Sequence, residues 1–192
     1  MRYIKDEEFI RGNCPMTKED IRILSVTKLQ IGDGYILLDV GAGTGSVSIQ
    51  MCKASPNGKV IAIEKDPEAL EVLAKNKEKF QVHNLEVIEG EALEVESGIE
   101  EIFDGIFVGG SGGNIEDIIK RYSLKLKVGG CMVLNFITID NFHKAMSILK
   151  ELDFTTECVQ VAVTMIKGQS HMLFANNPVF ILTGRKEVEL NG

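Results

Sequence analysis

A glycine-rich segment contains the residues best suited to bind a ligand. Residues 39–46 have the order Asp-Val-Gly-Ala-Gly-Thr-Gly-Ser, between an apolar run at 35–38 and a helical pattern at 47–51. Glycines at alternate positions let the backbone turn through positive φ and approach a ligand closely, because no Cβ intervenes. The helix that follows begins with free N–H groups. The segment therefore predicts a pocket for a nucleotide-type cofactor.

The glycine spacing disfavours a dinucleotide. Dinucleotide-binding turns carry G-x-G-x-x-G, whose third glycine allows close packing of the helix on the strand. Here the spacing is G-x-G-x-G, and Ser46 stands where that third glycine belongs. Asp39, just before the turn, would repel a pyrophosphate but could organise the loop or attract a ligand ammonium group. A cofactor with an amino-acid head fits these residues better.

A second candidate is the carboxylate at the end of the next apolar run, Lys59–Glu64. Glu64 lies about twenty residues beyond the glycines, where a ribose-binding acid is expected in nucleotide-binding folds. It could accept hydrogen bonds from both ribose hydroxyls. Alternatively, it could cap the helix that begins at Asp66-Pro67. Together with the glycine turn, the ribose interpretation is favoured.

The glycine turn, Glu64 and a third element together resemble the class I S-adenosylmethionine-dependent methyltransferases. That element is a strand pattern at 85–89 followed by Gly-Glu-Ala-Leu at 90–93, where this family places residues around the adenine. The resemblance implies a Rossmann-like α/β fold with a mostly parallel seven-stranded sheet and an antiparallel C-terminal hairpin. It covers nearly the whole chain.

Three segments narrow the resemblance: residues 14–22 (Cys-Pro-Met-Thr-Lys-Glu-Asp-Ile-Arg), 39–50, and 107–114 (Phe-Val-Gly-Gly-Ser-Gly-Gly-Asn). They are similar to the decarboxylating cobalt-precorrin carbon-15 methyltransferases of anaerobic cobalamin biosynthesis. The resemblance implies methyl transfer from S-adenosylmethionine to carbon 15 of cobalt-precorrin-6B, with loss of the carbon-12 acetate carboxyl, giving cobalt-precorrin-8. It also implies a homotetramer to which the C-terminal strands contribute. The implied cofactor contacts are Thr17, Gly41, Ala42, Gly43, Thr44, Gly45, Glu64 and Ala92.

The acceptor side is predicted at residues 109–113. Small residues leave room for a bulky planar substrate, and N–H groups near the helix that begins at Asn114 could face its carboxylates. We therefore expect Gly110, Ser111 and Gly112 to contact the tetrapyrrole, the alternative being a tight turn between strand and helix. Thr17 could equally be a helix N-cap, with Asp20 three residues later.

Substrate carboxylates also require cations. Lys18, Arg22, Lys167 and His171 are the candidates by position, although each could be a solvated charge or, for His171, hydrogen-bonded within its loop. Methyl transfer from a sulfonium to a nucleophilic macrocycle carbon depends mainly on in-line placement. No catalytic base is therefore predicted.

Alternating patterns predict the remaining elements: helices over 67–80, 114–122 and 139–152, and strands over 102–108 and 131–136. Two long β-type runs, 155–166 and 178–183, should pair as an antiparallel hairpin. The intervening residues 167–177 are expected to form a long loop that contacts another subunit, or else a flexible turn.

Length and composition favour one domain over residues 1–192, with 1–12 and 185–192 as frayed ends. The net charge of −7 disfavours nucleic acid as a partner. No signal-like or membrane-spanning segment is recognisable, so a cytoplasmic location without membrane contact is expected. Cys14, Cys52, Cys131 and Cys158 lack metal-ligand spacing and are interpreted as reduced thiols, with no metal site.

Two other functions remain open at this stage. One is a class I methyltransferase that acts on protein isoaspartate or transfer RNA, since the glycine turn and the acid alone do not select the acceptor. The other is a non-enzymatic S-adenosylmethionine-binding assembly subunit that needs another chain for chemistry.

Overall fold

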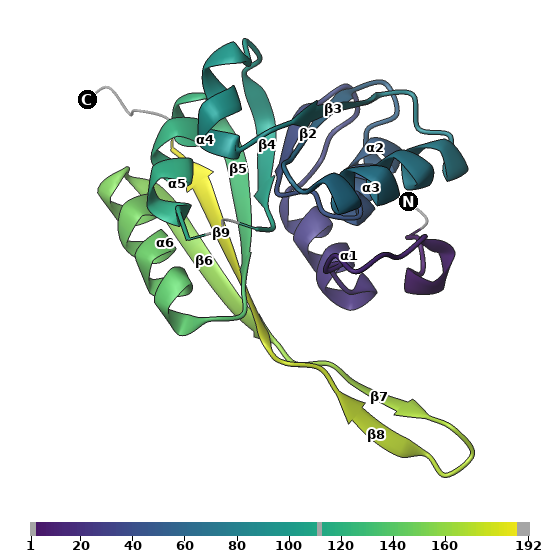
Figure 1. The fold of residues 1–192 in the computed structure, drawn as a ribbon. Coiled ribbons are helices and arrows are strands. Elements are labelled where there is room, and N and C mark those ends of the chain that lie inside the picture. The colour runs from purple at the N-terminus through teal and green to yellow at the C-terminus, as the bar shows by residue number, and fades with distance from the viewer. Residues whose placement is uncertain (1–2, 111–112, 188–192) are drawn as a thin grey trace.

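Seven strands form one sheet in the order β3-β2-β1-β4-β5-β9-β6 in the computed structural model, which describes residues 3–110 and 113–187 (Figure 1). The strands β1 to β5 run parallel to one another, whereas β9 pairs antiparallel with both β5 and β6. The predicted mostly parallel sheet with an antiparallel C-terminal hairpin is therefore confirmed. The strands are β1 (Ile36–Val40), β2 (Lys59–Glu64), β3 (Leu85–Glu89), β4 (Phe103–Val108), β5 (Leu126–Phe136), β6 (Phe154–Val161) and β9 (Val179–Lys186).

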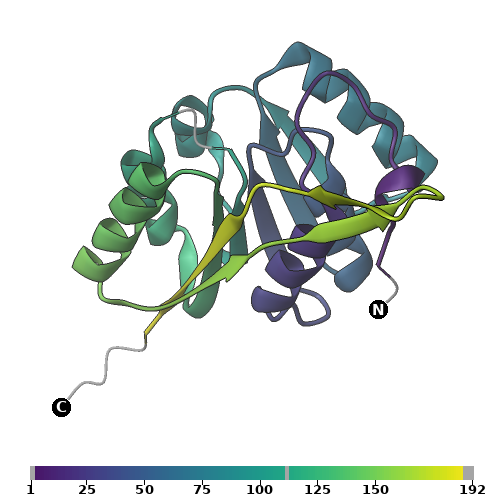
Figure 2. The ribbon, with the colours of Figure 1, turned by 90° about the horizontal axis from the view of Figure 1, so that it is seen from below.

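Helices cover both faces of this sheet, as the view from below shows (Figure 2). One face carries α1 (Glu19–Lys28), α2 (Ser46–Ala54) and α3 (Pro67–Lys79). The other carries α4 (Ala92–Val95), α5 (Ile115–Leu124) and α6 (Ile139–Glu151). Two single 3₁₀ turns, η1 (Asp6–Glu8) and η2 (Glu96–Gly98), complete the described helical elements. Burial on both faces explains why the central strands are continuous apolar runs.

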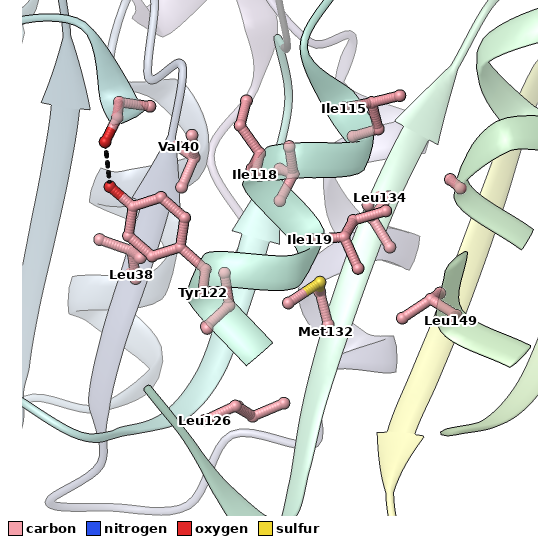
Figure 3. Close-up of a cluster of buried hydrophobic side chains, with 14 of the residues drawn as sticks. Leu38, Val40, Ile115, Ile118, Ile119, Tyr122, Leu126, Met132, Leu134 and Leu149 are labelled. Atoms are coloured by element: carbon pink, nitrogen blue, oxygen red, sulfur yellow. Dashed lines mark hydrogen bonds between the residues drawn. The ribbon is translucent and has the colours of Figure 1, made fainter. Parts of the chain in front are cut away.

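The core on the α5 side also fixes one wall of the site described below. Ile118 and Ile119 of α5 pack with Leu134 of β5, and Tyr122 lies fully buried among them (Figure 3). The Tyr122 hydroxyl donates a 2.6 Å hydrogen bond to the carbonyl oxygen of Ala92. This bond satisfies the buried phenol and positions the start of α4.

The ends of the chain correct the prediction of fraying. Residues 3–12 pack against α2 and α3: Ile4 N–H donates to Gln50 Oε1 at 3.0 Å, and Ile10 N–H donates to Asn76 Oδ1 at 2.8 Å. Phe9 is buried 4.8 Å from the Phe80 ring. At the other end, residues 185 and 186 belong to β9 and pair with β5 or β6. The prediction that residues 3–12 and 185–186 fray failed because their hydrogen bonds join segments distant in sequence. Residues 1–2 and 188–192 lie outside the described structure.

Arg22 corrects a second prediction, because it is fully buried and bonded to protein groups. Its guanidinium donates to Asp6 Oδ1 at 3.0 Å, to the Thr17 carbonyl at 2.8 Å and to the Ile4 carbonyl at 2.6 Å. It also stacks over the Phe9 ring at 4.8 Å. Arg22 is therefore a structural cation that anchors the N-terminal segment to α1.

Residues 167–177 form more than the predicted loop. Most of them belong to a separate two-stranded hairpin, β7 (Thr164–Lys167) and β8 (Met172–Ala175), which projects from the body of the molecule (Figure 1). Ile166 and Leu173 are 64% and 70% exposed on this arm. Contact of the arm with another subunit, and the homotetramer, remain predictions.

Replacing Arg22 by methionine should leave Asp6 and two carbonyls without their partner. We expect Arg22→Met to lower the free energy of unfolding by about 3–5 kcal/mol, the range for breaking a buried ion pair by removing one member. Urea unfolding followed by circular dichroism measures this. Arg11→Met is the matched control, since Arg11 is half exposed and lies 3.6 Å from the same carboxylate; it should change stability by less than about 1 kcal/mol. Equal effects of the two substitutions would contradict the anchoring role of Arg22.

Candidate cofactor and substrate site

A cavity of about 570 Å³ opens at the carboxyl ends of the parallel strands. It lies where β1 and β4 are neighbours, the point at which the order of parallel strands reverses and where open α/β sheets bind ligands. Its wall is built from residues 14–18, 40–43, 63–66, 90–92 and 109–110, together with Ile21, Ala69, Ile118, Asn135, Ile137 and Val179.

The glycine turn forms the cavity floor between β1 and α2. Gly41, Gly43 and Gly45 have φ values of +74°, +54° and +76°, which residues with a Cβ rarely adopt. At Gly41 a Cβ would also lie 2.6 Å from the carbonyl oxygen of Gly110, so the turn after β1 touches the turn after β4 backbone to backbone. At Gly41 the missing Cβ therefore permits a contact between two turns. The close approach of this backbone to a ligand stays a prediction.

Glu64 fastens this turn to the end of β2. One carboxylate oxygen accepts the Gly43 N–H at 2.7 Å, and the other accepts the N–H groups of Lys65 and Asp66 at 2.8 and 2.9 Å. The alternative role as cap of α3 is wrong, because Asp66 is the N-cap and accepts from Glu68 N–H at 2.8 Å. Glu64 thus stands at the cavity wall with its charge held by backbone donors, as a ribose-binding acid would.

Asp39 lies behind the turn and is fully buried. Its carboxyl accepts a hydrogen bond from the Ser48 hydroxyl, and its other oxygen has no partner among the described residues. Burial is the main cause that raises the pKa of Asp39 to about 7, opposed by the Ser48 hydrogen bonds. Asp39 is absent from the cavity wall and therefore organises the loop rather than meeting a ligand ammonium group.

Most of the predicted cofactor contacts meet at this wall, namely Thr17, Gly41, Ala42, Gly43, Glu64 and Ala92. Thr44 and Gly45 do not. Thr44 is buried with its carbonyl accepting from Asn76 of α3, and a Cβ at Gly45 would lie 2.9 Å from Leu73. The chain has already turned toward α3 at these two residues, which pack against that helix. Their contact with the cofactor stays a prediction.

The segment before α1 supplies a wall that was only partly predicted. Thr17 lines the cavity, and the alternative role as N-cap is wrong, because Lys18 occupies the N-cap position of α1. Cys14 and Met16 also line the cavity and were not predicted. Burial raises the pKa of the Cys14 thiol, so the thiol is neutral at physiological pH. The neighbouring Pro15 carbonyl lies 3.1 Å from where a Cβ of Gly43 would be, which packs this segment onto the glycine turn.

The predicted substrate residues divide into four groups. Gly110 and Lys18 line the cavity, whereas Arg22 is buried below it. Ser111 and Gly112 lie outside the described residues. Lys167 belongs to β7 and His171 is exposed at the turn of the arm, which contributes nothing to the described cavity wall. Asn135, Ile137 and Val179 at the ends of β5 and β9 were missed.

The part of the chain that the structure describes shows neither a metal-binding cluster nor a membrane-spanning helix. Residues 3–110 and 113–187 contain no group of three His, Cys, Asp or Glu residues placed to hold a metal ion. All four cysteines are free. Within the same ranges, no helix combines the length and apolar character needed to cross a membrane.

Similarity to known proteins identifies the family. Residues 8–186 match the family model of the precorrin methyltransferase domain. The chain belongs to this family. The resemblance carried by residues 14–22, 39–50 and 107–114 is thereby confirmed.

Relatives in the precorrin methyltransferase family match over their full length. A probable cobalt-precorrin-6B C(15)-methyltransferase (decarboxylating) of Sulfolobus acidocaldarius is 43% identical, with 96% of this chain and 97% of the relative covered. The cobalt-precorrin-6B C(15)-methyltransferase (decarboxylating) of Salmonella typhimurium is 39% identical, with 96% of each covered.

Solved structures agree with this fold. The precorrin-6y C5,15-methyltransferase of Geobacter metallireducens superposes with a TM-score of 0.91 at 35% identity, covering 96% of both chains. The precorrin 8w decarboxylase of Methanobacterium thermoautotrophicum gives 0.86 at 29% identity, covering 94% of this chain and 98% of the other.

The buried Asp39 should make stability depend on pH. Its pKa in the folded chain is raised, so the folded state holds the proton up to about pH 7, whereas an unfolded aspartate loses it near pH 4. This group therefore makes the free energy of unfolding fall as pH rises through that window, by up to about 1.4 kcal/mol per unit. Asp39→Asn removes this term, so the stability of the variant relative to wild type should rise between pH 4 and 7.

Urea unfolding at several pH values measures that difference. Asp33→Asn is the control, because Asp33 is exposed and its pKa is lowered, chiefly by the Asn57 side chain. The control should not alter the pH dependence above pH 4. A pH-independent difference between wild type and Asp39→Asn would refute the assignment.

Proposed function

We propose that the chain methylates carbon 15 of cobalt-precorrin-6B with S-adenosylmethionine as donor and removes the carbon-12 acetate carboxyl as carbon dioxide. The product would be cobalt-precorrin-8, in anaerobic cobalamin biosynthesis. The observation that carries this proposal is the full-length similarity to relatives named for this reaction. The cavity at the β1–β4 reversal supplies a site of suitable size and composition.

The residues present fit S-adenosylmethionine on one side of the cavity. Glu64 lines the cavity wall and would accept hydrogen bonds from the ribose, while Gly90 and Ala92 line the wall where the adenine is expected. Gly41 and Gly43 line the wall where the amino-acid head is expected. Both positions require glycine, because a Cβ would meet the Gly110 backbone or the Pro15 carbonyl. When bound, S-adenosylmethionine supplies a methyl group on a positively charged sulfur.

The chain's own contribution on the other side is orientation and exclusion of water. Gly109, Gly110, Ile137 and Val179 form a surface of small and apolar residues on which a planar macrocycle can lie. An apolar surrounding favours loss of a carboxylate, because the charge is dispersed as the carbon–carbon bond breaks. The neutral Cys14 thiol at the opposite wall does not compete as a nucleophile.

The alternative acceptors receive less support. Solved methyltransferases with other acceptors share the fold; a transfer RNA methyltransferase of Aquifex aeolicus superposes with a TM-score of 0.76 at 18% identity. That likeness concerns the fold alone. The non-enzymatic alternative differs from our proposal in one respect: it requires a second chain before any product forms.

The proposed reaction is tested with the purified chain, S-adenosylmethionine and cobalt-precorrin-6B. We expect a product that has gained one methyl group and lost carbon dioxide, seen by mass spectrometry without any added protein. An unchanged substrate mass with a folded, cofactor-binding chain would overturn the proposal in favour of an assembly subunit. Methylation without decarboxylation would retain a methyltransferase but exclude the decarboxylating reaction.

The role of Glu64 is tested by calorimetry. Glu64→Ala should weaken S-adenosylmethionine binding by about 1–3 kcal/mol, because hydrogen bonds to a charged acceptor are lost. Glu89→Ala is a matched control: Glu89 ends β3, pairs with Glu64 in the sheet, is exposed and does not line the cavity. The control should bind like wild type. Unchanged affinity in a folded Glu64→Ala variant would exclude Glu64 from the cofactor site.

A further inference from the structure

A second cavity of about 300 Å³ adjoins the first at the ends of β4 and β5. The two share Gly109, Asn135 and Ile137, so they meet at these three residues on the acceptor side of the sheet and are together called the joint hollow. The second cavity extends from this junction to the first turn of α6, where Thr138 and Asn141 line it. It is too small for a tetrapyrrole ring but large enough for the ring's side arms.

Asn135 is the polar group at the junction. Its Oδ1 accepts a 3.1 Å hydrogen bond from the hydroxyl of Ser25, a fully buried residue of α1. The same hydroxyl donates to the Ile21 carbonyl at 2.8 Å, so its one proton is shared between the two acceptors. The Asn135 Nδ2 atom is buried and has no hydrogen-bond partner among the described residues. Leaving a buried amide N–H without an acceptor costs free energy, so a ligand oxygen that accepts from Nδ2 would remove this cost.

The rest of the second cavity favours an anionic acceptor. Its described lining contains no charged side chain, so nothing there repels a carboxylate. Thr138 is the N-cap of the thirteen-residue α6 but makes no side-chain cap bond, which leaves first-turn N–H groups as further donors. The charged residues of the joint hollow line the first cavity: Lys18, Glu64, Lys65, Asp66 and Glu91.

We propose that the second cavity binds a carboxylate arm of the tetrapyrrole and that Asn135, held by Ser25, donates its Nδ2 hydrogen bond to that arm. This inference rests on the proposed function, which supplies an acceptor rich in carboxylates. Fixing one arm at the junction sets the rotation of the macrocycle in its plane. It therefore selects which ring carbon faces the methyl donor.

The arm held by Asn135 is one that the product keeps. A hydrogen-bond donor stabilises the carboxylate charge, and decarboxylation removes that charge, so such a donor would slow loss of the arm it holds. The departing carboxyl is better placed against the apolar residues near Ile137. Weakening the Asn135 contact should consequently impair methylation and decarboxylation together.

Asn135→Asp tests the donor role of the Asn135 amide with little change in side-chain shape. It replaces the donor with a negative charge, and we expect the KM for cobalt-precorrin-6B to rise about tenfold or more. Affinity for S-adenosylmethionine should stay within about twofold, because the cofactor contacts lie across the cavity. Gln160→Glu makes the same amide-to-carboxylate change on the exposed face of β6, outside both cavities, and should leave KM unchanged.

Asn141→Asp is a second variant, which keeps the proposal testable if Asn135→Asp fails to fold. An aspartate in the first turn of α6 favours the helix, so the variant should be at least as stable as wild type. The same charge lines the second cavity and should raise KM several-fold by repelling the carboxylate arm. A purely structural role for this region predicts the opposite pattern, with stability altered and KM retained.

The outcomes separate this proposal from the proposed function. Wild-type KM in folded Asn135→Asp and Asn141→Asp overturns the arm-binding site while the wild-type chain remains an active methyltransferase. An inactive wild-type chain overturns the proposed function and this inference with it. Accumulation of methylated product that keeps every carboxylate in Asn135→Asp would overturn the assignment of Asn135 to a retained arm.

Discussion

The backbone contact between Gly41 and Gly110 is the constraint on which the site depends. The strand order places β1 and β4 side by side, and a Cβ on Gly41 would lie 2.6 Å from the Gly110 carbonyl oxygen. The Gly109 N–H also donates to the Val40 carbonyl at 3.0 Å, which continues the pairing past the strand ends. Because the two turns touch without side chains, the floor between them stays open for a ligand. The contact with the turn after β4 therefore requires glycine in this turn, just as the proposed close approach to a ligand does.

This contact also divides the cavity into two chemically different halves. The half next to β2 and β3 is charged, with Glu64 holding three N–H groups and Lys65 paired to Glu91 at 2.7 Å. The half next to β4 and β5 presents small and apolar residues with one amide, Asn135. A charged cofactor with a ribose suits the first half. A planar acceptor that must lose a carboxylate suits the second half. A weakly polar surrounding does not stabilise the carboxylate before the C–C bond breaks, when neutral carbon dioxide leaves and the electron pair passes to the macrocycle.

Sequence patterns predicted the elements that neighbouring residues define and missed the contacts between residues far apart in the sequence. The strand runs 59–64 and 85–89 match β2 and β3 because apolar residues bounded by turn signals suffice to define them. Glu64 was found by its fixed distance from the glycine turn. Asn135 was missed because its partner Ser25 lies 110 positions away, and no local pattern joins them. Arg22 was misassigned for the same reason: an arginine on a helix is ordinarily solvated, and only the docked N-terminal segment buries it.

The buried Arg22 shows why fold and site cannot be separated in this chain. Its guanidinium binds the Thr17 carbonyl as well as Asp6 and the Ile4 carbonyl, so one cation holds both the N-terminal segment and the cavity wall at 14–18. That wall in turn packs on the glycine turn, where a Cβ of Gly43 would lie 3.1 Å from the Pro15 carbonyl. The wall at 14–18 and the docked N-terminal segment therefore share one guanidinium as their common partner. The N-terminal segment supports the site from behind, since no residue before Cys14 lines the described cavity.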